Sequence, residues 1–232
     1  MGMAAPMAMS TDMPATSKET MTTAPAEQQL ILQNWFSPAF PIGAFSYSGG
    51  LETAIARGDV HDRDSLADWL RTVLSHGSVF TDAVFLGAAL DGEDVNDLCL
   101  ALCPGAERHQ ETAELGAAFA RIMRETQGID LPAGLAYPVA VGMAARRTGL
   151  AREATLAAFI QAACMNQISV AVRAVPIGQM DGQACLVALT PAIEQATARA
   201  IETDVGAVGS FAMAADLCVL EHEMTKQRIY RT

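Results

Sequence analysis

Charged side chains are scarce in this sequence, and basic ones are scarcer than acidic ones. Charged residues make up 18% of the 232 positions, with 15 Lys and Arg against 26 Asp and Glu, so the formal net charge is −11. Binding to a phosphate backbone or to an anionic membrane surface depends on clustered Lys and Arg side chains. The composition argues against both, and we expect neither a nucleic-acid partner nor membrane association.

Long hydrophobic runs are also missing. A membrane-spanning helix needs about 18–20 apolar residues in succession. Gln161, Asn166 and Gln167 interrupt one of the longest stretches, and Pro132 and Pro138 interrupt another. The start of the sequence has neither the basic residues nor the unbroken apolar core of a secretory signal. We therefore predict a cytoplasmic protein.

Sequence signatures of metal, nucleotide or nucleophile chemistry are absent. The four histidines are scattered without zinc-ligand spacing, and the sequence contains no P-loop and no nucleophile elbow. The five cysteines are an odd number in apolar surroundings, which favours reduced thiols packed in a core. Nothing in the sequence therefore indicates an enzyme, a bound metal or a cofactor.

Helical periodicity, by contrast, dominates from Glu27 onward. Asp62 or Asp64 is placed to cap one predicted helix, and Gly128 is placed to end another. Alternating strand patterns are nearly absent. Apolar residues recur on one helical face in five segments, around residues 66–74, 115–123, 156–167, 186–193 and 211–224. The sequence predicts an all-α fold, a single-domain compact helical bundle over residues 29–232.

Residues 1–28 have a different composition, rich in Met, Ala, Thr and Pro, with no aromatic residue and no apolar period. Such a segment buries too little apolar surface to offset the entropy of ordering it. We predict a disordered tail that can be deleted without loss of stability.

The composition also bears on self-association. The chain is 51% hydrophobic, and many of its helical positions are Ala or Gly. Few charges then remain to cover the surface of one globule, while small residues let helices approach closely. We expect a homodimer.

Three segments have compositions that helix packing alone does not require. Residues 37–52 combine prolines, glycines and aromatics in an ordered turn, and residues 173–183 form a polar break between two helices. Residues 222–232 end an acidic protein with basic and aromatic side chains. Because the last apolar helical face ends near Met224, we expect Arg228, Tyr230 and Arg231 to lie outside the core, on a segment that stays mobile until a partner binds.

The residues alone leave more than one function open. One interpretation is a small all-α enzyme or ligand-binding regulator with a polar pocket around Arg173, Gln179 and Asp181. Another is a helical homodimer that serves in a larger assembly. Saturable ligand binding by the isolated protein would favour the first, and stable co-purification with partner proteins would favour the second.

The three segments resemble motifs of the UreF family of urease accessory proteins. Residues 37–52 follow the family's opening motif S-P-A-L-P-V-G-G-F-S-Y-S-x-G-L-E nearly throughout, with Ala44 in place of its second glycine. Further motifs match residues 111–119, 137–142, 173–183 and 214–232, the last of which includes His222-Glu223. The motifs keep the family's order, and the resemblance covers about residues 29–232.

The resemblance implies an all-helical, dimeric, non-enzymatic chaperone subunit. Proteins of this family join a UreD (UreH)-type accessory protein and the GTPase UreG in a complex that activates apo-urease by inserting nickel. GTP hydrolysis belongs to UreG, which agrees with the missing P-loop, and regulation of that GTPase is a further role that the resemblance suggests.

The resemblance also implies two interaction surfaces. The surface for the UreD-type partner would consist of Arg228, Ile229, Tyr230 and Arg231. Removing residues 228–232 should then abolish partner capture and leave stability intact. The dimer or UreG-facing surface would consist of Ser46, Tyr47, Glu52, Arg173, Gln179, Asp181 and Gln183.

Overall fold

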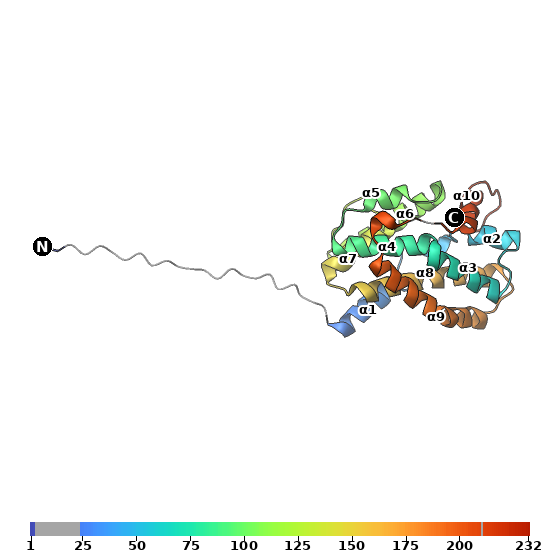
Figure 1. The fold of residues 1–232 in the computed structure, drawn as a ribbon, viewed down its shortest axis with the longest axis horizontal. Helices are drawn as coiled ribbons and strands as arrows, with labels where there is room; N and C mark the ends of the chain where they lie inside the picture. The colour runs from blue at the N-terminus through green and yellow to red at the C-terminus, as the bar shows by residue number, and fades with distance from the viewer. Residues whose placement is uncertain (3–23, 210) are drawn as a thin grey trace.

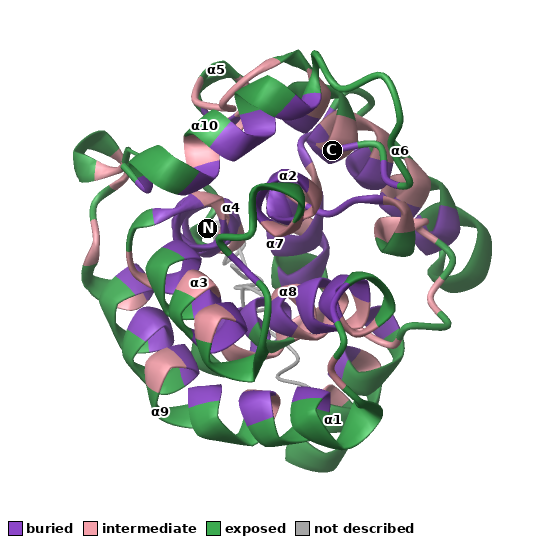
Figure 2. Ribbon diagram, turned by 90° about the vertical axis from the view of Figure 1, so that its right-hand side faces the viewer, coloured by how far each residue is buried: buried purple, intermediate pink, exposed green. Residues whose placement is uncertain are grey.

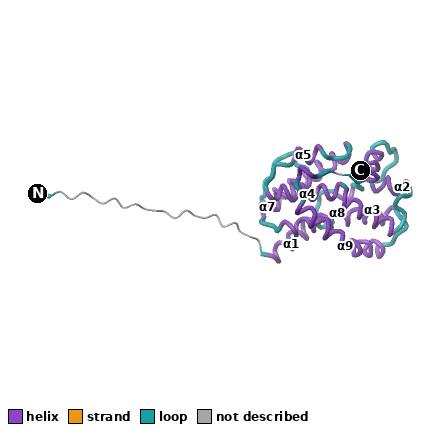
Figure 3. Tube along the Cα trace, in the orientation of Figure 1, coloured by secondary structure: helices purple, strands orange, loops and turns teal. Residues whose placement is uncertain are grey.

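The computed structural model describes residues 1–2, 24–209 and 211–232. Across these residues the chain forms helices joined by loops and turns, with no strand (Figure 3). The predicted all-α fold is therefore confirmed. The helices are α1 (Pro25–Trp35), α2 (Leu51–Arg57), α3 (Arg63–His76), α4 (Ser78–Asp91), α5 (Asn96–Ala101), α6 (Ala106–Gln127), α7 (Tyr137–Thr148), α8 (Arg152–Ala174), α9 (Gln179–Glu202) and α10 (Met213–His222), with 3-10 turns η1 (Ala44–Ser46) and η2 (Val205–Ala207).

The predicted tail over residues 1–28 ends too late. Most of it, residues 3–23, lies outside the described residues. Helix α1 already begins at Pro25, because proline has no N–H to leave unsatisfied and its fixed φ suits the first helical position. The side chain of Gln28 then reaches the start of α8 by accepting a hydrogen bond of 2.9 Å from the Ala151 N–H. Residues 25–28 thus belong to the helical body.

Local capping signals form as the sequence predicts. Asp62 caps α3 by accepting the Ser65 N–H at 2.8 Å. Gly128 ends α6 in the left-handed conformation, with φ of 66°. Pro191, by contrast, lies inside α9 without ending it. Helix α9 packs against α3, α4 and α8, and this tertiary packing supports a continuous helix.

Helix α4 occupies the middle of the bundle and packs against α3, α7, α8 and α9 (Figure 1). Its Phe85 and Leu86 are fully buried. The approach of α7 is close enough to require glycine at Gly142, since a Cβ there would lie 2.4 Å from the Leu86 carbonyl oxygen. Buried residues line the inward faces of the surrounding helices, whereas their outer faces are exposed (Figure 2).

Two apolar stretches have the length and hydropathy of a membrane span, although inspection for unbroken runs predicted none. They are Arg63–Asp91, which covers α3 and α4, and Arg152–Ala174, which is α8. In their most apolar windows 72% and 50% of the residues are buried within the bundle. Core helices of a helical bundle satisfy the same criteria, so packing accounts for the first stretch. Most of the remaining residues of the second stretch are half-buried, and Ala158, Ala163 and Val172 among them pack against the core.

Candidate functional site

The last residues of the chain fold back onto the segment that precedes α2. After α10 ends, residues 225–232, called the arm from here on, run between α2, α6 and α10 (Figures 1 and 2). The Arg231 N–H donates to the Ser46 carbonyl oxygen at 2.9 Å, and the Ser48 N–H donates to the Thr232 carbonyl oxygen at 3.1 Å. The Ser48 hydroxyl donates to the same oxygen. The arm and residues 46–48 therefore form one hydrogen-bonded unit.

Glu52 binds the main chain of the arm. Its Oε1 accepts the Ile229 N–H at 2.7 Å, and its Oε2 accepts the Tyr230 N–H at 3.0 Å. Burial by itself would raise the pKa of Glu52, but these two hydrogen bonds and one from His222 outweigh it and hold the pKa below its usual value. Glu52 is placed here because α2 begins at Leu51, directly after Gly50. The φ of 82° at Gly50 and its close contact with Val219 of α10 leave no room for a Cβ.

A second carboxylate, Glu114 of α6, binds the side chains. The Tyr47 hydroxyl donates to its Oε2 at 2.6 Å. The Arg231 guanidinium donates to both oxygens, at 2.6 Å and 3.0 Å, in the bidentate geometry that arginine forms with carboxylates. Hydrogen bonds from Arg231 and then from Tyr47 lower the pKa of Glu114 to about 2. Burial and the neighbouring Glu114 raise the pKa of Tyr47, which stays protonated as the donor.

The position of Tyr230 corrects the prediction that the arm lies outside the core. Its side chain is only 5% exposed and belongs to the main hydrophobic cluster, whereas the adjacent Ile229 is 82% exposed. The prediction was wrong because helical periodicity stops where α10 stops. The chain then turns and returns to the body, which no local pattern encodes. Arg228 and Arg231 are exposed as expected, but both are paired with carboxylates of α6.

Sequence reasoning missed the acidic face of α6 that receives the arm. Glu107 pairs with Arg228, Glu111 Oε2 accepts the Thr232 hydroxyl at 2.9 Å, and Glu114 holds Arg231. Positions 107, 111 and 114 follow the i, i+4, i+7 spacing of one helical face. An acidic stripe on one helix and a basic C-terminal segment in the same chain are the signal from which this contact could have been predicted.

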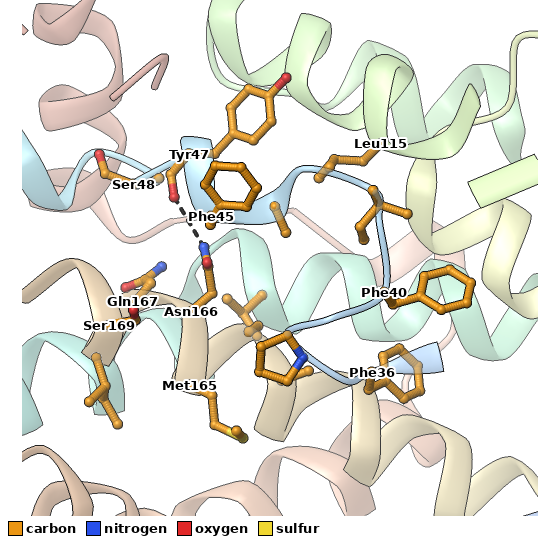
Figure 4. A pocket seen from close by; sticks show the side chains of 18 of the residues that line it. Phe36, Phe40, Phe45, Tyr47, Ser48, Leu115, Met165, Asn166, Gln167 and Ser169 are labelled. Atoms are coloured by element: carbon orange, nitrogen blue, oxygen red, sulfur yellow. Dashed lines mark hydrogen bonds between the residues drawn. The ribbon is translucent and has the colours of Figure 1, made fainter. Parts of the chain in front are cut away.

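A cavity of about 690 Å³ lies beside this site, between residues 36–49, α8 and the start of α9 (Figure 4). Phe36 and Phe40 line one side, and Asn166 and Gln167 of α8 line the other. Asn166 Nδ2 donates to the Tyr47 carbonyl oxygen at 3.0 Å, the contact drawn in Figure 4. The cavity wall therefore includes the same segment that binds the arm.

The second predicted segment is only partly a loop. The break between α8 and α9 is residues 175–178, and Gln179 already opens α9. Arg173, Gln179 and Gln183 line the cavity, while Asp181 does not and instead accepts the Gly178 N–H at 3.4 Å. The three residues of the predicted polar pocket do not converge on one point of the cavity.

The lining of the cavity includes a buried ion pair. Arg108 is 7% exposed, pairs with Asp82 of α4 and lies 3.8 Å from Glu111. Burial raises the pKa of Asp82 to about 6 even though Arg108 opposes the shift. Because Glu111 also binds Thr232, a continuous polar chain runs from the arm to the interior.

Metal-binding groups do not cluster in the described part of the chain, where no three His, Cys, Asp or Glu residues are arranged to hold an ion. All five cysteines are free, and burial raises the pKa of each thiol. They are protonated packing residues, as their apolar surroundings predicted.

Comparison with known proteins gives consistent matches. The family model described as UreF matches residues 60–190. A urease accessory protein UreF of Cereibacter sphaeroides (strain KD131) is 47% identical over 88% of this chain and 98% of its own length. Proteins of the same name from Rhodopseudomonas palustris (strain BisB5) and Roseobacter denitrificans are 45% and 39% identical, over 92% and 94% of this chain and 97% and 98% of their own lengths.

Proposed function

The chain belongs to the UreF family of urease accessory proteins, and on that premise we propose that it is a non-catalytic subunit of the complex that activates apo-urease by inserting nickel. In this role it joins a UreD (UreH)-type protein to the GTPase UreG in the cytoplasm, and nickel is the cargo of the complex. The work of such a subunit lies in its surfaces.

The observation that carries this proposal is an apolar strip beside the arm. Met213, Leu217, Leu220 and Met224 are spaced four, three and four residues apart, so they share one face along α10 and the turn after it, and they are between 45% and 83% exposed. Ile229 of the arm is exposed as well. Exposed apolar side chains gathered on one face of this kind mark protein interfaces. We assign the α10 strip, defined by these four residues, and Ile229 to the UreD-type partner.

The part played by the arginines and Tyr230 is narrower than the sequence suggested. Arg228, Tyr230 and Arg231 are engaged within the chain itself. These three side chains would therefore act by holding the arm in place. Ile229 and the exposed edges of the two arginine side chains would then face the partner. Tyr47 and Glu52 would contribute in the same way, since both bind the arm.

We assign the UreG-facing surface to the turn between α8 and α9. Arg173, Gln179, Asp181 and Gln183 are exposed there and present both signs of charge. Mixed polar surfaces of this type suit an interface that forms and breaks. Contact at this turn is also where regulation of the GTPase would act.

The proposed homodimer has a candidate face on α8. Half of its most apolar window is not fully buried, and the half-buried residues include Ala162, Met165 and Val172, which line the cavity. Covering that face with a second copy would remove apolar surface from water. Light scattering across micromolar concentrations tests this, and a monomer at every concentration would exclude a dimer formed without partners.

A pull-down after coexpression with UreD-type and UreG-type proteins tests the assignment of the α10 strip. Leu220→Asp should reduce capture of the UreD-type partner by at least about tenfold, because it places a charge within an apolar interface. Val187→Asp is the matched control, since Val187 is 72% exposed on α9, away from the strip. Full capture by Leu220→Asp would contradict the assignment.

The ligand-binding alternative has the cavity as its structural support. Arg173 and Gln179 line it, but Asp181 does not. Saturable binding of a small molecule by the isolated chain, lost in Arg173→Ala, would favour that function over the accessory role.

A further inference from the structure

His222 lies at the meeting point of three separate parts of the chain. It is completely buried at the end of α10. Its Nε2 is 3.0 Å from Glu52 Oε2 on α2, and its Nδ1 is 2.7 Å from Glu107 Oε2 on α6. We propose that His222 is a positioning residue that holds the arm in its docked conformation by fixing these two carboxylates.

The two carboxylates that flank His222 are those that hold residues 228–230 of the arm. Glu52 accepts the main-chain N–H groups of Ile229 and Tyr230. Glu107 pairs through its other oxygen with Arg228. Glu107 thus contacts the imidazole with one oxygen and the arm with the other, whereas Oε2 of Glu52 contacts both the imidazole and the Tyr230 N–H. The orientation of each carboxylate toward the arm therefore depends on the ring.

Hydrogen bonding gives the imidazole a role that an apolar side chain of equal size lacks. Both ring nitrogens lie within hydrogen-bond distance of carboxylate oxygens. The carboxylates of Glu52 and Glu107 are only 17% and 15% exposed, so they have little access to water as an alternative partner. Without the ring, both carboxylates would turn toward water and release their contacts with the arm.

The next residue, Glu223, holds the start of α6 in place beside His222. Its Oε1 accepts the N–H groups of Ala106 and Glu107 at 2.6 Å and 3.2 Å, which satisfies free donors at the start of α6. Gly105 leaves room for this carboxylate, because a Cβ there would lie 2.7 Å from Glu223 Oε1. His222 and Glu223 therefore fix the first turn of α6, and with it Glu107.

The remaining ion pair of the arm is a weaker restraint. Arg231 and Glu114 have side chains that are 51% and 40% exposed, and exposed ion pairs contribute little. The buried cluster at His222 should therefore restrain the arm more strongly than this ion pair does. This conclusion concerns the isolated chain; only its consequence for partner capture rests on the proposed function.

Hydrogen exchange of the isolated full chain, read by mass spectrometry, tests the proposal without any partner. In His222→Gln the Ile229 and Tyr230 amides should exchange at least about tenfold faster, while the core amides of α4 keep their protection. Cleavage by a lysine-specific protease after the exposed Lys226 should accelerate in parallel. The control is His109→Gln, because His109 is exposed on α6.

Two further variants separate positioning of the carboxylates from simple packing. His222→Lys places a cation beside the carboxylates and should retain part of the arm protection that His222→Gln loses. Glu52→Gln should release the arm as well, and the double variant His222→Gln with Glu52→Gln should be no worse than the more severe single one, since both break the same cluster.

Unchanged arm protection in His222→Gln would overturn the proposal. So would protection lost equally in α4 and the arm in both His222→Gln and Glu52→Gln, because the cluster would then support the whole fold. If the arm is released but the UreD-type partner is still captured at full strength, the positioning role stands and the assigned partner surface is wrong.

Discussion

The Tyr47 hydroxyl donates a 2.6 Å hydrogen bond to Glu114 Oε2, which joins the segment before α2 to the middle of α6. Arg231 completes the contact from the arm, with its guanidinium 5.3 Å from the centre of the Tyr47 ring. Three segments that are distant in the sequence therefore converge on one carboxylate, and the following predictions concern this convergence and the packing behind it.

Tyr47→Phe removes one of the hydrogen bonds to Glu114 and leaves the ring in place. We expect the arm to be less protected from hydrogen exchange and the free energy of unfolding to fall by about 0.5–1.5 kcal/mol, the usual contribution of such a bond. Urea denaturation measures the second quantity. Phe45→Leu is the control, because Phe45 is 63% exposed and contacts no part of this network through a polar group; an equal loss in both variants would contradict the prediction.

Alanine substitutions at two adjacent residues of the arm should affect different properties of the protein. Tyr230→Ala should lower the free energy of unfolding by about 3–5 kcal/mol, as for other buried aromatics, because its side chain is only 5% exposed. Ile229→Ala should leave stability nearly unchanged and weaken capture of the UreD-type partner. Thermal unfolding and the pull-down measure the two effects.

This pair also reverses a prediction made from sequence alone, that removal of residues 228–232 leaves stability intact. The deleted chain should melt at a lower temperature, since it lacks Tyr230. An unaltered melting temperature would show that the arm is not docked in solution.

Acid should weaken the contribution of the arm to stability. The pKa values of Glu52 and Glu114 are lowered in the folded chain, the second to about 2, so these carboxyls bind fewer protons when the arm is docked. The stabilisation from these two carboxylates is complete when the pH is above the pKa of an ordinary glutamate, about 4.3. It is lost as the pH falls toward their lowered pKa values.

The difference in unfolding free energy between the full chain and a chain without residues 228–232 isolates this effect. It should shrink steadily between pH 6 and acidic conditions of about pH 3. Asp82 behaves in the opposite way, because its pKa is raised to about 6 and folding is favoured as the pH falls through that value. It is present in both chains and cancels; a difference that grew with acid would contradict the prediction.

Gly142→Ala should disrupt the packing of α7 on α4. The added Cβ would lie 2.4 Å from the Leu86 carbonyl oxygen, and backbone atoms cannot move aside as a side chain can. We expect a loss of about 1–3 kcal/mol in the free energy of unfolding. Gly209→Ala, where a Cβ meets nothing within 4 Å, is the control and should change it little.

Helices and their ends were predictable because their signals are local. The period of apolar residues around residues 66–74 and 156–167 predicted α3 and α8, and the caps at Asp62 and Gly128 depend on neighbours three or four residues away. The start of α1 was not predicted, because it depends on one residue, Pro25 at the first helical position, and not on a repeating pattern. The motifs that pointed to the family are likewise readable in order along the chain.

The site itself depended on contacts across long stretches of sequence. Glu52 and Tyr230 are 178 residues apart, and Tyr47 and Arg231 are 184 apart. No periodicity relates such positions, so the sequence assigned them to two separate surfaces, whereas the folded chain joins them. By itself the sequence determined the helical class, the helix ends at Asp62 and Gly128, and the family, because these follow from local patterns. Only the tertiary structure decided that Tyr230 is buried and that the acidic face of α6 binds the arm, because burial depends on where the chain returns after its last helix.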